Sequence, residues 1–254
     1  MKYEVLITIC GRAGSKGFKN KNLKTFLGHP LVYYTLSAAE LFCKKVQDVA
    51  DVDICLNTDS EELAGIVAKH YPEVYYIRRE SSLGESNVPK PAVWHNCVDV
   101  MQEKNGIRYD YMIDLDITSP LRQADDVYGA FELKLQRPDA DLVESMCKAR
   151  RNPYFNMMKE DGEFVSTVID CSFVARQQAP TVYDENASIY VLRADYFCEN
   201  GDMMNTAKTV PFIMRDTAVL DIDSEEDFLL MEVVGKYLYS NVKTYKAIRD
   251  NIRE

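Results

Sequence analysis

The sequence lacks the features of membrane proteins and secreted proteins. Its 254 residues contain no apolar stretch of about 18 residues, which is the length that a membrane-spanning helix needs. The first residues lead directly into a strand pattern, without the regions of a secretion signal. The seven cysteines form no C-x-x-C pair, and most lie in apolar runs, as buried and reduced thiols do. We therefore expect a cytoplasmic protein with no membrane segment.

Histidine is scarce, and internal repeats and low-complexity segments are absent. The three histidines are scattered and do not have the spacing of metal ligands. The net charge of −10 argues against nucleic acid as a partner, so an anionic substrate would need a local basic patch. The chain is long enough to bury a full core, and we predict one domain over residues 1–254.

Acidic residues are missing between Glu4 and Glu40. Within this gap an apolar, β-branched run stops at the segment Gly11–Gly17, and an amphipathic helical pattern begins at Pro30. A strand, a glycine-rich loop and a helix in this order form a phosphate-binding site, because glycine lets backbone N–H groups approach an anion. Positive charge comes from the basic residues of the same stretch, which are Arg12, Lys16, Lys19, Lys21 and Lys24. The alternative is a glycine-rich turn that carries solvated lysines.

This loop does not match the two common phosphate-binding motifs. A Walker A loop would need glycine at the position of Lys16, and the dinucleotide-binding motif G-x-G-x-x-G would need glycine at the position of Ala13. The sequence therefore excludes both motifs at this position.

Strand and helix patterns alternate along most of the chain, which predicts an α/β fold with a mostly parallel sheet and helices on both faces. The last helix begins with Ser224-Glu-Glu-Asp227, which has the arrangement of a capping box, and a polar, helical tail follows. The predicted strands are 3–10, 53–56, 74–77, 111–115, 187–192 and 209–214, and the predicted helices are 30–44, 90–104, 124–136 and 224–241, with one more helix after 57–60.

The pattern changes near residue 141. Short extended runs at 141–147, 154–159 and 163–169 are joined by turn residues such as Glu160-Asp-Gly162. We interpret this region as a small antiparallel excursion, because it lacks the helix of another βαβ unit.

The sequence Asp221-Ile-Asp223, directly before the last helix, is a candidate Mg²⁺ site. Two carboxylates at i and i+2 can point the same way where the backbone turns. Hard oxygen ligands that leave positions for water and phosphate suit Mg²⁺. The alternative is a helix N-cap formed by Asp223 or Ser224. The two interpretations are compatible, because one residue can cap the helix while another binds metal.

A second Asp-x-Asp, Asp114-Leu-Asp116, ends the predicted central strand, and Thr118-Ser-Pro-Leu-Arg122 follows it. Proteins of the α/β class bind ligands at the carboxyl ends of their strands. Asp116 could therefore help to hold a metal or contact a sugar, or it could cap the next turn.

The pattern Gly11-x-x-Gly14-Ser15-Lys16-Gly17-x-x-x-Lys21-Asn22 resembles the signature loop of the acylneuraminate cytidylyltransferases, the family of the CMP-sialic acid synthetases and their relatives. That family usually has alanine at the position of Gly11. The resemblance covers nearly the whole chain. It implies a nucleotide-diphospho-sugar transferase fold, which is Rossmann-like, and a homodimer. It also implies a dimerisation insertion, here at about 145–186, that reaches over the partner's active site.

The resemblance also implies roles for single residues. Arg12 and Lys16 would hold the triphosphate of CTP together with the loop amides at Gly14 and Ser15, and they would stabilise the charge on pyrophosphate. Asp221 and Asp223 would hold Mg²⁺. Asn22 and Arg79, which has Arg78 as its neighbour, would lie beside the nucleotide. Arg176 would reach the substrate from the partner subunit, and Asn186 would line the sugar pocket. The full set with implied substrate contacts is Lys21, Asn22, Arg79, Asp116, Ser119, Arg176 and Asn186.

The sugar end of the site departs from the family pattern. Asp116-Ile117 replaces the usual Gln-Pro, Asp184 replaces a basic residue, and the family's sugar-binding lysine has no match. The run Ala149-Arg-Arg-Asn-Pro-Tyr-Phe-Asn156, with Asn186-Ala-Ser-Ile-Tyr190, is more similar to the legionaminic-acid branch than to the N-acetylneuraminate branch. One of the two arginines in the first run could bind the sugar carboxylate, or both could be surface charges.

The resemblance implies a cytidylyltransferase that converts CTP and a nine-carbon 2-keto sugar acid, of the legionaminic or N-acetylneuraminic type, to a CMP-sugar and pyrophosphate. The nearest alternative is a nucleotidyltransferase for another sugar, such as an octulosonic acid or a sugar 1-phosphate. A metal-dependent glycosyltransferase also combines a nucleotide-binding sheet with Asp-x-Asp, but the Gly-Ser-Lys-Gly loop argues against it. A protein that binds CTP without turnover is the third alternative.

Overall fold

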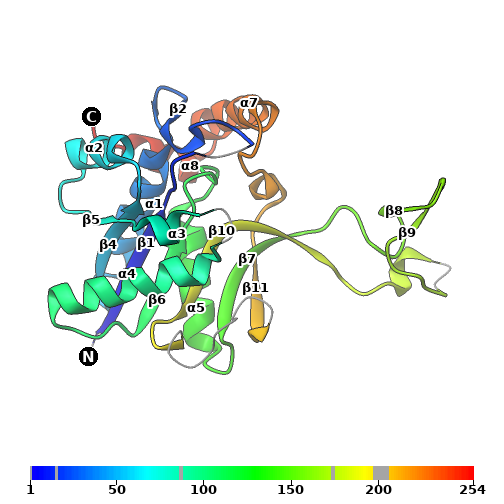
Figure 1. Cartoon of the computed structure of the whole chain (residues 1–254), viewed down its shortest axis with the longest axis horizontal. Helices are drawn as coiled ribbons and strands as arrows, with labels where there is room; N and C mark the ends of the chain where they lie inside the picture. The colour runs from blue at the N-terminus through cyan, green and yellow to red at the C-terminus, as the bar shows by residue number, and fades with distance from the viewer. Residues whose placement is uncertain (1, 15–16, 86–87, 173–174, 197–205) are drawn as a thin grey trace.

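A seven-stranded sheet forms the centre of the protein, as the computed structural model in Figure 1 shows. The structure describes residues 2–14, 17–85, 88–172, 175–196 and 206–254. The strands follow the order β11-β7-β10-β6-β1-β4-β5 across the sheet, and all pairs are parallel except those of β10 with β6 and β7. The strands are β1 (Tyr3–Cys10), β4 (Ala50–Thr58), β5 (Tyr75–Arg78), β6 (Tyr111–Leu115), β7 (Leu142–Lys148), β10 (Tyr183–Arg193) and β11 (Thr209–Ile213).

Helices cover both faces of this sheet, as the alternating pattern predicts. The helices are α1 (Leu31–Val46), α2 (Glu61–His70), α3 (Ser81–Gly84), α4 (Lys90–Asn105), α5 (Ala124–Gln136), α7 (Glu225–Asn241) and α8 (Lys243–Asp250). Helix α4 packs on one face through residues that include Trp94 and Cys97, while α1, α5 and α8 pack on the other face through residues that include Leu36, Phe131 and Ile248. None of the helices in the described ranges has both the length and the hydrophobicity to span a bilayer.

Strand β1 is buried on both faces because its side chains alternate between two apolar layers. Val5, Ile7 and Ile9 belong to the layer of α1, and Leu6 belongs to the layer of α4. A parallel strand with both faces covered reads as a continuous apolar run, which is what the first ten residues show. The strand ends where the glycine-rich loop begins, so this loop starts at the carboxyl edge of the sheet.

The segment 141–147 is not part of the excursion, and this prediction was wrong. The structure places it in the main sheet as β7, parallel to β11 and antiparallel to β10. The run predicted at 154–159 is also different, because residues 153–156 form turns and the next strand begins at Met158.

A two-stranded sheet of its own lies between β7 and β10. It consists of β8 (Met158–Asp161) and β9 (Phe164–Thr167), and it lies at the end of a long extension away from the central sheet (Figure 1). Phe164 and Val165 are strongly exposed there. Further short elements are the paired strands β2 (Thr25–Phe26) and β3 (His29–Pro30) and the 3-10 helices η1 (Lys21–Leu23), η2 (Arg176–Gln178) and η4 (Asp216–Val219).

Candidate functional site

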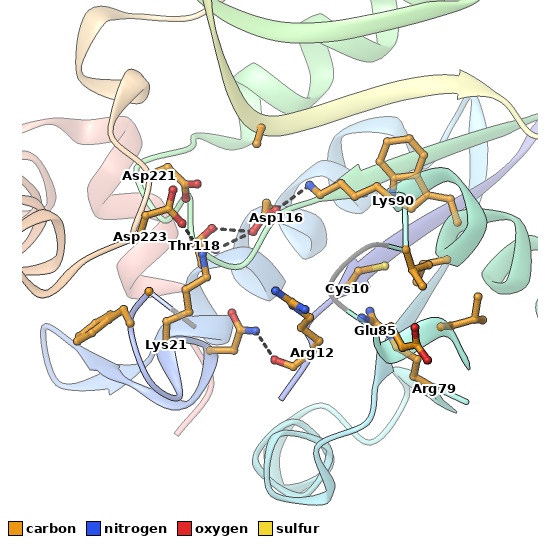
Figure 2. Close-up of a pocket in the computed structure, with 18 residues that line it drawn as sticks. Cys10, Arg12, Lys21, Arg79, Glu85, Lys90, Asp116, Thr118, Asp221 and Asp223 are labelled. Atoms are coloured by element: carbon orange, nitrogen blue, oxygen red, sulfur yellow. Dashed lines mark hydrogen bonds and ion pairs between the residues drawn. The ribbon is translucent and has the colours of Figure 1, made fainter. Parts of the chain in front are cut away.

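A cavity of about 440 Å³ lies at the carboxyl ends of β1, β5 and β6 (Figure 2). This is the edge at which α/β proteins bind ligands. The residues predicted from sequence that line it are Arg12, Lys21, Asn22, Arg79, Asp116, Asp221 and Asp223. The fold thus brings together residues from both ends of the chain.

The glycine-rich loop is held in place by strand β4 and the turn after it. The amide of Gly11 donates to the carbonyl of Asn57 at 3.1 Å, and the amide of Ala13 donates to Oδ1 of Asp59 at 2.6 Å. Asn22 is buried, and its Nδ2 donates to the carbonyl of Arg12 at 3.1 Å. The guanidinium of Arg12 lines the cavity and has no hydrogen bond or ion pair among the described residues, so it is free to meet an anion there.

The two halves of the site meet where the loop touches the segment before α7. A Cβ atom added at Gly17 would lie 2.8 Å from the carbonyl oxygen of Asp223, so only glycine fits there without a shift. Lys21 Nζ donates to the carbonyl of Ile222 and to Oδ1 of Asp223, each at 2.9 Å. The basic loop and the acidic segment, some 200 residues apart in sequence, are therefore directly bonded.

The N-cap of α7 is formed by Ser224 and Asp227, and not by Asp221 or Asp223. The hydroxyl of Ser224 accepts from the amide of Asp227 at 3.1 Å, and the amide of Ser224 donates to Oδ2 of Asp227 at 2.8 Å. This confirms the predicted capping box. The carboxylates of Asp221 and Asp223 are thus not needed by the helix, and both line the cavity.

Asp221 and Asp116 lie in the same cavity but have opposite electrostatic environments. Burial, and then the nearby charge of Asp116, raise the pKa of Asp221 to about 6, although a hydrogen bond from Thr118 opposes the change. Burial would also raise the pKa of Asp116, but Lys90 and the hydrogen bonds of Thr118 hold it well below its ordinary value. Asp116 therefore keeps its negative charge, whereas the pKa of Asp221 lies close to neutral pH, so that a change in nearby charge can change its protonation.

Lys90 is a cavity residue that the sequence interpretation missed. Its Nζ lies 2.8 Å from Oδ2 of Asp116 and 3.7 Å from Oδ2 of Asp114. Asp114 itself is buried, and its Oδ1 accepts from the hydroxyl of Thr8 at 2.7 Å. One signal was available in the sequence: Lys90 is the first residue of a helix, where the helix dipole disfavours a cation.

The structure separates the two neighbouring arginines at the end of β5. Arg79 is buried and lines the cavity, with its Nε donating to Oδ1 of Asn57 at 2.6 Å. Arg78 is exposed and lies 3.5 Å from Glu61. The sequence prediction, which chose Arg79 and named Arg78 as its neighbour, therefore selected the arginine that lines the cavity.

Other predicted residues lie away from this cavity. Ser119 is buried and does not line it. Asn186 is also buried, with Oδ1 accepting from the hydroxyl of Ser145 at 2.6 Å. Gly14 adopts a φ of +68°, which favours glycine, and does not line the cavity. Arg150 is exposed, with its Nη2 3.2 Å from Oδ2 of Asp216, and it does not line this cavity. Ser15, Lys16 and the side chain of Arg176 lie outside the described residues.

One strained residue forms part of the cavity wall. Ala187 in β10 has a φ of +50°, in the left-handed region that residues other than glycine rarely adopt. It lies where the register between β10 and β7 shifts, and it lines the cavity. The buried Arg122 links this part of the wall to the segment after β6, because its guanidinium donates to the carbonyls of Ser188 at 2.6 Å and Asp116 at 3.1 Å.

The arrangement combines cations for an anionic ligand with carboxylates for a metal ion. Among the described residues no three His, Cys, Asp or Glu side chains gather into a closed metal site. Mg²⁺ does not need such a site, since it is commonly held by one or two carboxylates together with water and substrate phosphates. The cavity-lining pair Asp221 and Asp223 fits this requirement.

The chain is similar in sequence to known proteins. Residues 6–228 match a family model described as Cytidylyltransferase. The chain is 36% identical over 234 residues to the "Post-translational flagellin modification protein B" of Campylobacter coli, which spans 92% of this chain and 95% of that protein. It is 34% identical over 229 residues to the "CMP-N,N'-diacetyllegionaminic acid synthase" of Campylobacter jejuni, with 90% of this chain and 94% of that protein covered.

A solved structure shares the fold. The CMP:2-keto-3-deoxy-manno-octonic acid synthetase, solved with CTP, superposes with a TM-score of 0.60 over 91% of this chain and 98% of that one, at 15% sequence identity. At this identity the similarity shows the fold alone.

Proposed function

Since the chain belongs to the cytidylyltransferase family and is a nucleotidyltransferase, we propose that it activates a nine-carbon 2-keto sugar acid of the legionaminic type with CTP, giving a CMP-sugar and pyrophosphate. One structural observation carries this proposal. The guanidinium of Arg12, which has no partner among the described residues, lines the same cavity as Asp221 and Asp223, and Lys21 is bonded to Asp223. Such a site suits a triphosphate and its metal ion.

The reaction is an in-line displacement at the α-phosphorus of CTP. The anomeric hydroxyl of the sugar acid gives up its proton to water and its oxygen forms the new P–O bond. The bond to the bridging oxygen breaks, so that pyrophosphate leaves with the electron pair. Catalysis of this kind depends mainly on positioning and on neutralising charge. Arg12, Lys16 and the loop amides bind the phosphates and stabilise the charge that grows on pyrophosphate.

The nucleoside is expected on the β5 side of the cavity. Arg79 and Asn22 line the wall there, and both are fixed by hydrogen bonds to the backbone of the loop or of β4. Fixed donors of this kind orient a base and ribose without a loss of side-chain freedom on binding.

Asp221 and Asp223 would hold Mg²⁺. When bound, this ion would supply positive charge to the phosphates and favour the ionised form of the attacking hydroxyl. Lys21 Nζ lies 2.9 Å from Oδ1 of Asp223, so its charge offsets part of the negative charge of this pair.

We further propose a cytoplasmic homodimer. The β8–β9 hairpin exposes Phe164 and Val165 far from the central sheet, which supports a role in contact with a second copy. The cysteines in the described ranges are free thiols, as expected of a protein in a reducing compartment.

Pyrophosphate release, measured with Mg²⁺ and with EDTA, tests the proposal. The assay crosses CTP and the other nucleoside triphosphates with legionaminate, N-acetylneuraminate, pseudaminate and octulosonate. We expect release with CTP and Mg²⁺, fastest with legionaminate. Faster turnover of pseudaminate or N-acetylneuraminate would reassign the sugar and keep the reaction. No release with any of these pairs would reject the proposal.

A further inference from the structure

Lys90 lies between two buried or half-buried carboxylates and an aromatic ring. Its ammonium is 2.8 Å from Asp116, 3.7 Å from Asp114 and 4.8 Å from the centre of the Tyr190 ring. The side chain remains 37% exposed and lines the cavity. Burial would lower the pKa of Lys90, but the charges of Asp116 and Asp114 raise it, so the amine stays protonated.

The position of Lys90 is unfavourable for the helix itself. It is the first residue of α4, where a positive charge opposes the helix dipole at a cost in stability. The ion pair with Asp116 offsets this cost, and Asp116 in turn depends on Lys90. The carboxylate of Asp116 is fixed at both oxygens, since Oδ2 accepts from Lys90 and Oδ1 accepts from the amide and hydroxyl of Thr118 at 3.0 and 2.8 Å.

This pair lies in the half of the cavity that faces away from the proposed nucleoside position. The glycine-rich loop follows β1 in the middle of the sheet, and Arg79 follows β5 on one side of it. Asp116 follows β6 on the other side, and Tyr190 and the strained Ala187 belong to β10, the next strand outward. Two reactants that meet at the phosphates must occupy opposite sides, so the second reactant lies against Lys90 and Asp116.

Electrostatics decides which part of this reactant the pair can bind. A cavity lysine is the obvious partner for a sugar carboxylate. Here, however, the single charge of Lys90 is shared by Asp116 and Asp114, and Asp221 lies in the same cavity. The sugar carboxylate would be repelled by these three neighbours. The pair instead presents a donor and an acceptor side by side, which complements a neutral group with both functions, such as an acylamino group or two adjacent hydroxyls.

We propose that Lys90 is a positioning and specificity-determining residue, which fixes Asp116 so that the pair recognises the acylamino and hydroxyl substituents of the acceptor sugar. This inference rests on the proposed function, because it concerns the sugar side of the same site. It assigns the sugar carboxylate to other groups.

The test combines steady-state kinetics with CTP binding measured by calorimetry. The variants are Lys90→Met, Lys90→Arg, Asp116→Asn and the double variant Lys90→Met/Asp116→Asn. We expect Lys90→Met to raise the KM for the sugar acid at least tenfold, with a change of less than threefold in the Kd for CTP. Lys90→Arg, which keeps the charge, should recover most of the loss.

Two further readouts separate positioning from a general structural role. The ratio of kcat/KM between legionaminate and N-acetylneuraminate, which differ in acylamino and hydroxyl substituents, should change at least fivefold in Lys90→Met. Because Lys90 and Asp116 act as one unit, the double variant should lose about as much as one single variant, and not the product of both losses. Lys104→Met, at the other end of α4, is the matched control and should resemble the wild type.

Different results would reject the proposed function and the inference about Lys90. A wild-type protein without turnover of any sugar acid rejects the proposed function, and the inference falls with it. An active wild type whose Lys90→Met variant keeps its sugar KM and sugar preference rejects the inference alone. Equal loss of CTP affinity and sugar affinity, or multiplying losses in the double variant, also rejects it. If Lys90→Met does not fold, as judged by circular dichroism, Lys90→Arg and the isosteric Asp116→Asn carry the same comparison.

Discussion

The side chain of Ile117 fills the space beside Gly11. A Cβ atom added at Gly11 would lie 2.7 Å from Cδ1 of Ile117 and 2.9 Å from Cδ2 of Leu63. A larger residue at position 11 would therefore need Ile117 and Leu63 to move.

This relationship predicts a coupling between the two positions. Gly11→Ala should lower the free energy of unfolding by about 1–3 kcal/mol through overpacking, and Ile117→Ala should lower it by about 2–5 kcal/mol through a cavity. The double variant should be more stable than the sum of the two losses predicts, since each change relieves the other. Urea denaturation of the four proteins measures the coupling, and simple additivity would contradict it.

The loop cations should matter for turnover far more than other cations of the same stretch. Arg12→Met and Lys16→Ala should each lower kcat/KM by more than about a hundredfold, because each removes positive charge from the phosphates in the transition state. Lys24, which lies over the ring of Phe18 and does not line the cavity, provides the control. Lys24→Met should retain most of the activity. Full activity in Lys16→Ala would remove the main assignment for this loop.

Two adjacent residues before α7 should separate metal binding from helix capping. Asp223→Asn, and likewise Asp221→Asn, should lower kcat/KM by about a hundredfold or more and weaken the response to Mg²⁺, with little change in Tm. Ser224→Ala should do the reverse, with a loss of about 1 kcal/mol in stability and little change in turnover, because it removes only the cap. Magnesium titrations and thermal melts of the three variants test this separation. Normal metal response in both aspartate variants would place the ion elsewhere.

Glu144 should make stability depend on pH. Burial, and then the charge of Glu185, raise its pKa from 4.5 to about 7, against a hydrogen bond with Tyr190 and the charge of Lys90. The native state therefore holds this proton more tightly than the unfolded state, so stability falls as pH rises from about 4.5 to 7 and is constant above. Glu144→Gln should match the wild type near pH 4.5 and exceed it by about 1–3 kcal/mol at pH 8.

The matched control for Glu144 is Glu103→Gln, which removes one exposed acid from α4. Denaturant unfolding of the three proteins at several pH values gives the comparison. An advantage of Glu144→Gln that does not grow with pH would contradict the assignment.

The exposed hairpin predicts a specific loss of self-association. Phe164 is 78% exposed and Val165 is 66% exposed, so serine at both positions should leave the fold intact and shift the dimer to a monomer. Val233→Ser, at a position on α7 that is 71% exposed, is the control for loss of apolar surface. Light scattering coupled to size-exclusion chromatography gives the mass. A wild type that is monomeric at micromolar concentration would contradict the proposed dimer.

Local sequence patterns predicted the elements better than their partners. The capping box at Ser224 and the apolar strand β1 depend on residues close together in sequence, and both are confirmed. The assignment of 141–147 to an excursion failed because membership of a sheet depends on distant pairing. Its neighbours β10 and β11 begin at Tyr183 and Thr209, and no local pattern shows that they enclose it.

The same limit applies to the site. Motif matching placed Arg79 and Asp223 in the cavity, because both belong to segments that end at the carboxyl edge of the sheet. It could not show that the side chains of Ser119 and Asn186 turn into the core, since a motif carries no side-chain direction. Lys90 was missed because it belongs to α4, which packs on the other face of the sheet from α1, α5 and α8. Only the folded structure brings it next to Asp116.

The reversed direction of β10 has a consequence for how this protein can evolve. The chain leaves the sheet at Lys148 and returns at Tyr183, and these two residues are paired with each other. Because the ends of this segment are already neighbours, its length can change at a small cost in loop-closure free energy, about 0.6 kcal/mol for each doubling of the length. The hairpin extension is therefore an exchangeable module. Its replacement can alter which surface the molecule presents to a partner, while the order of the seven strands and the residues at their edge remain the same.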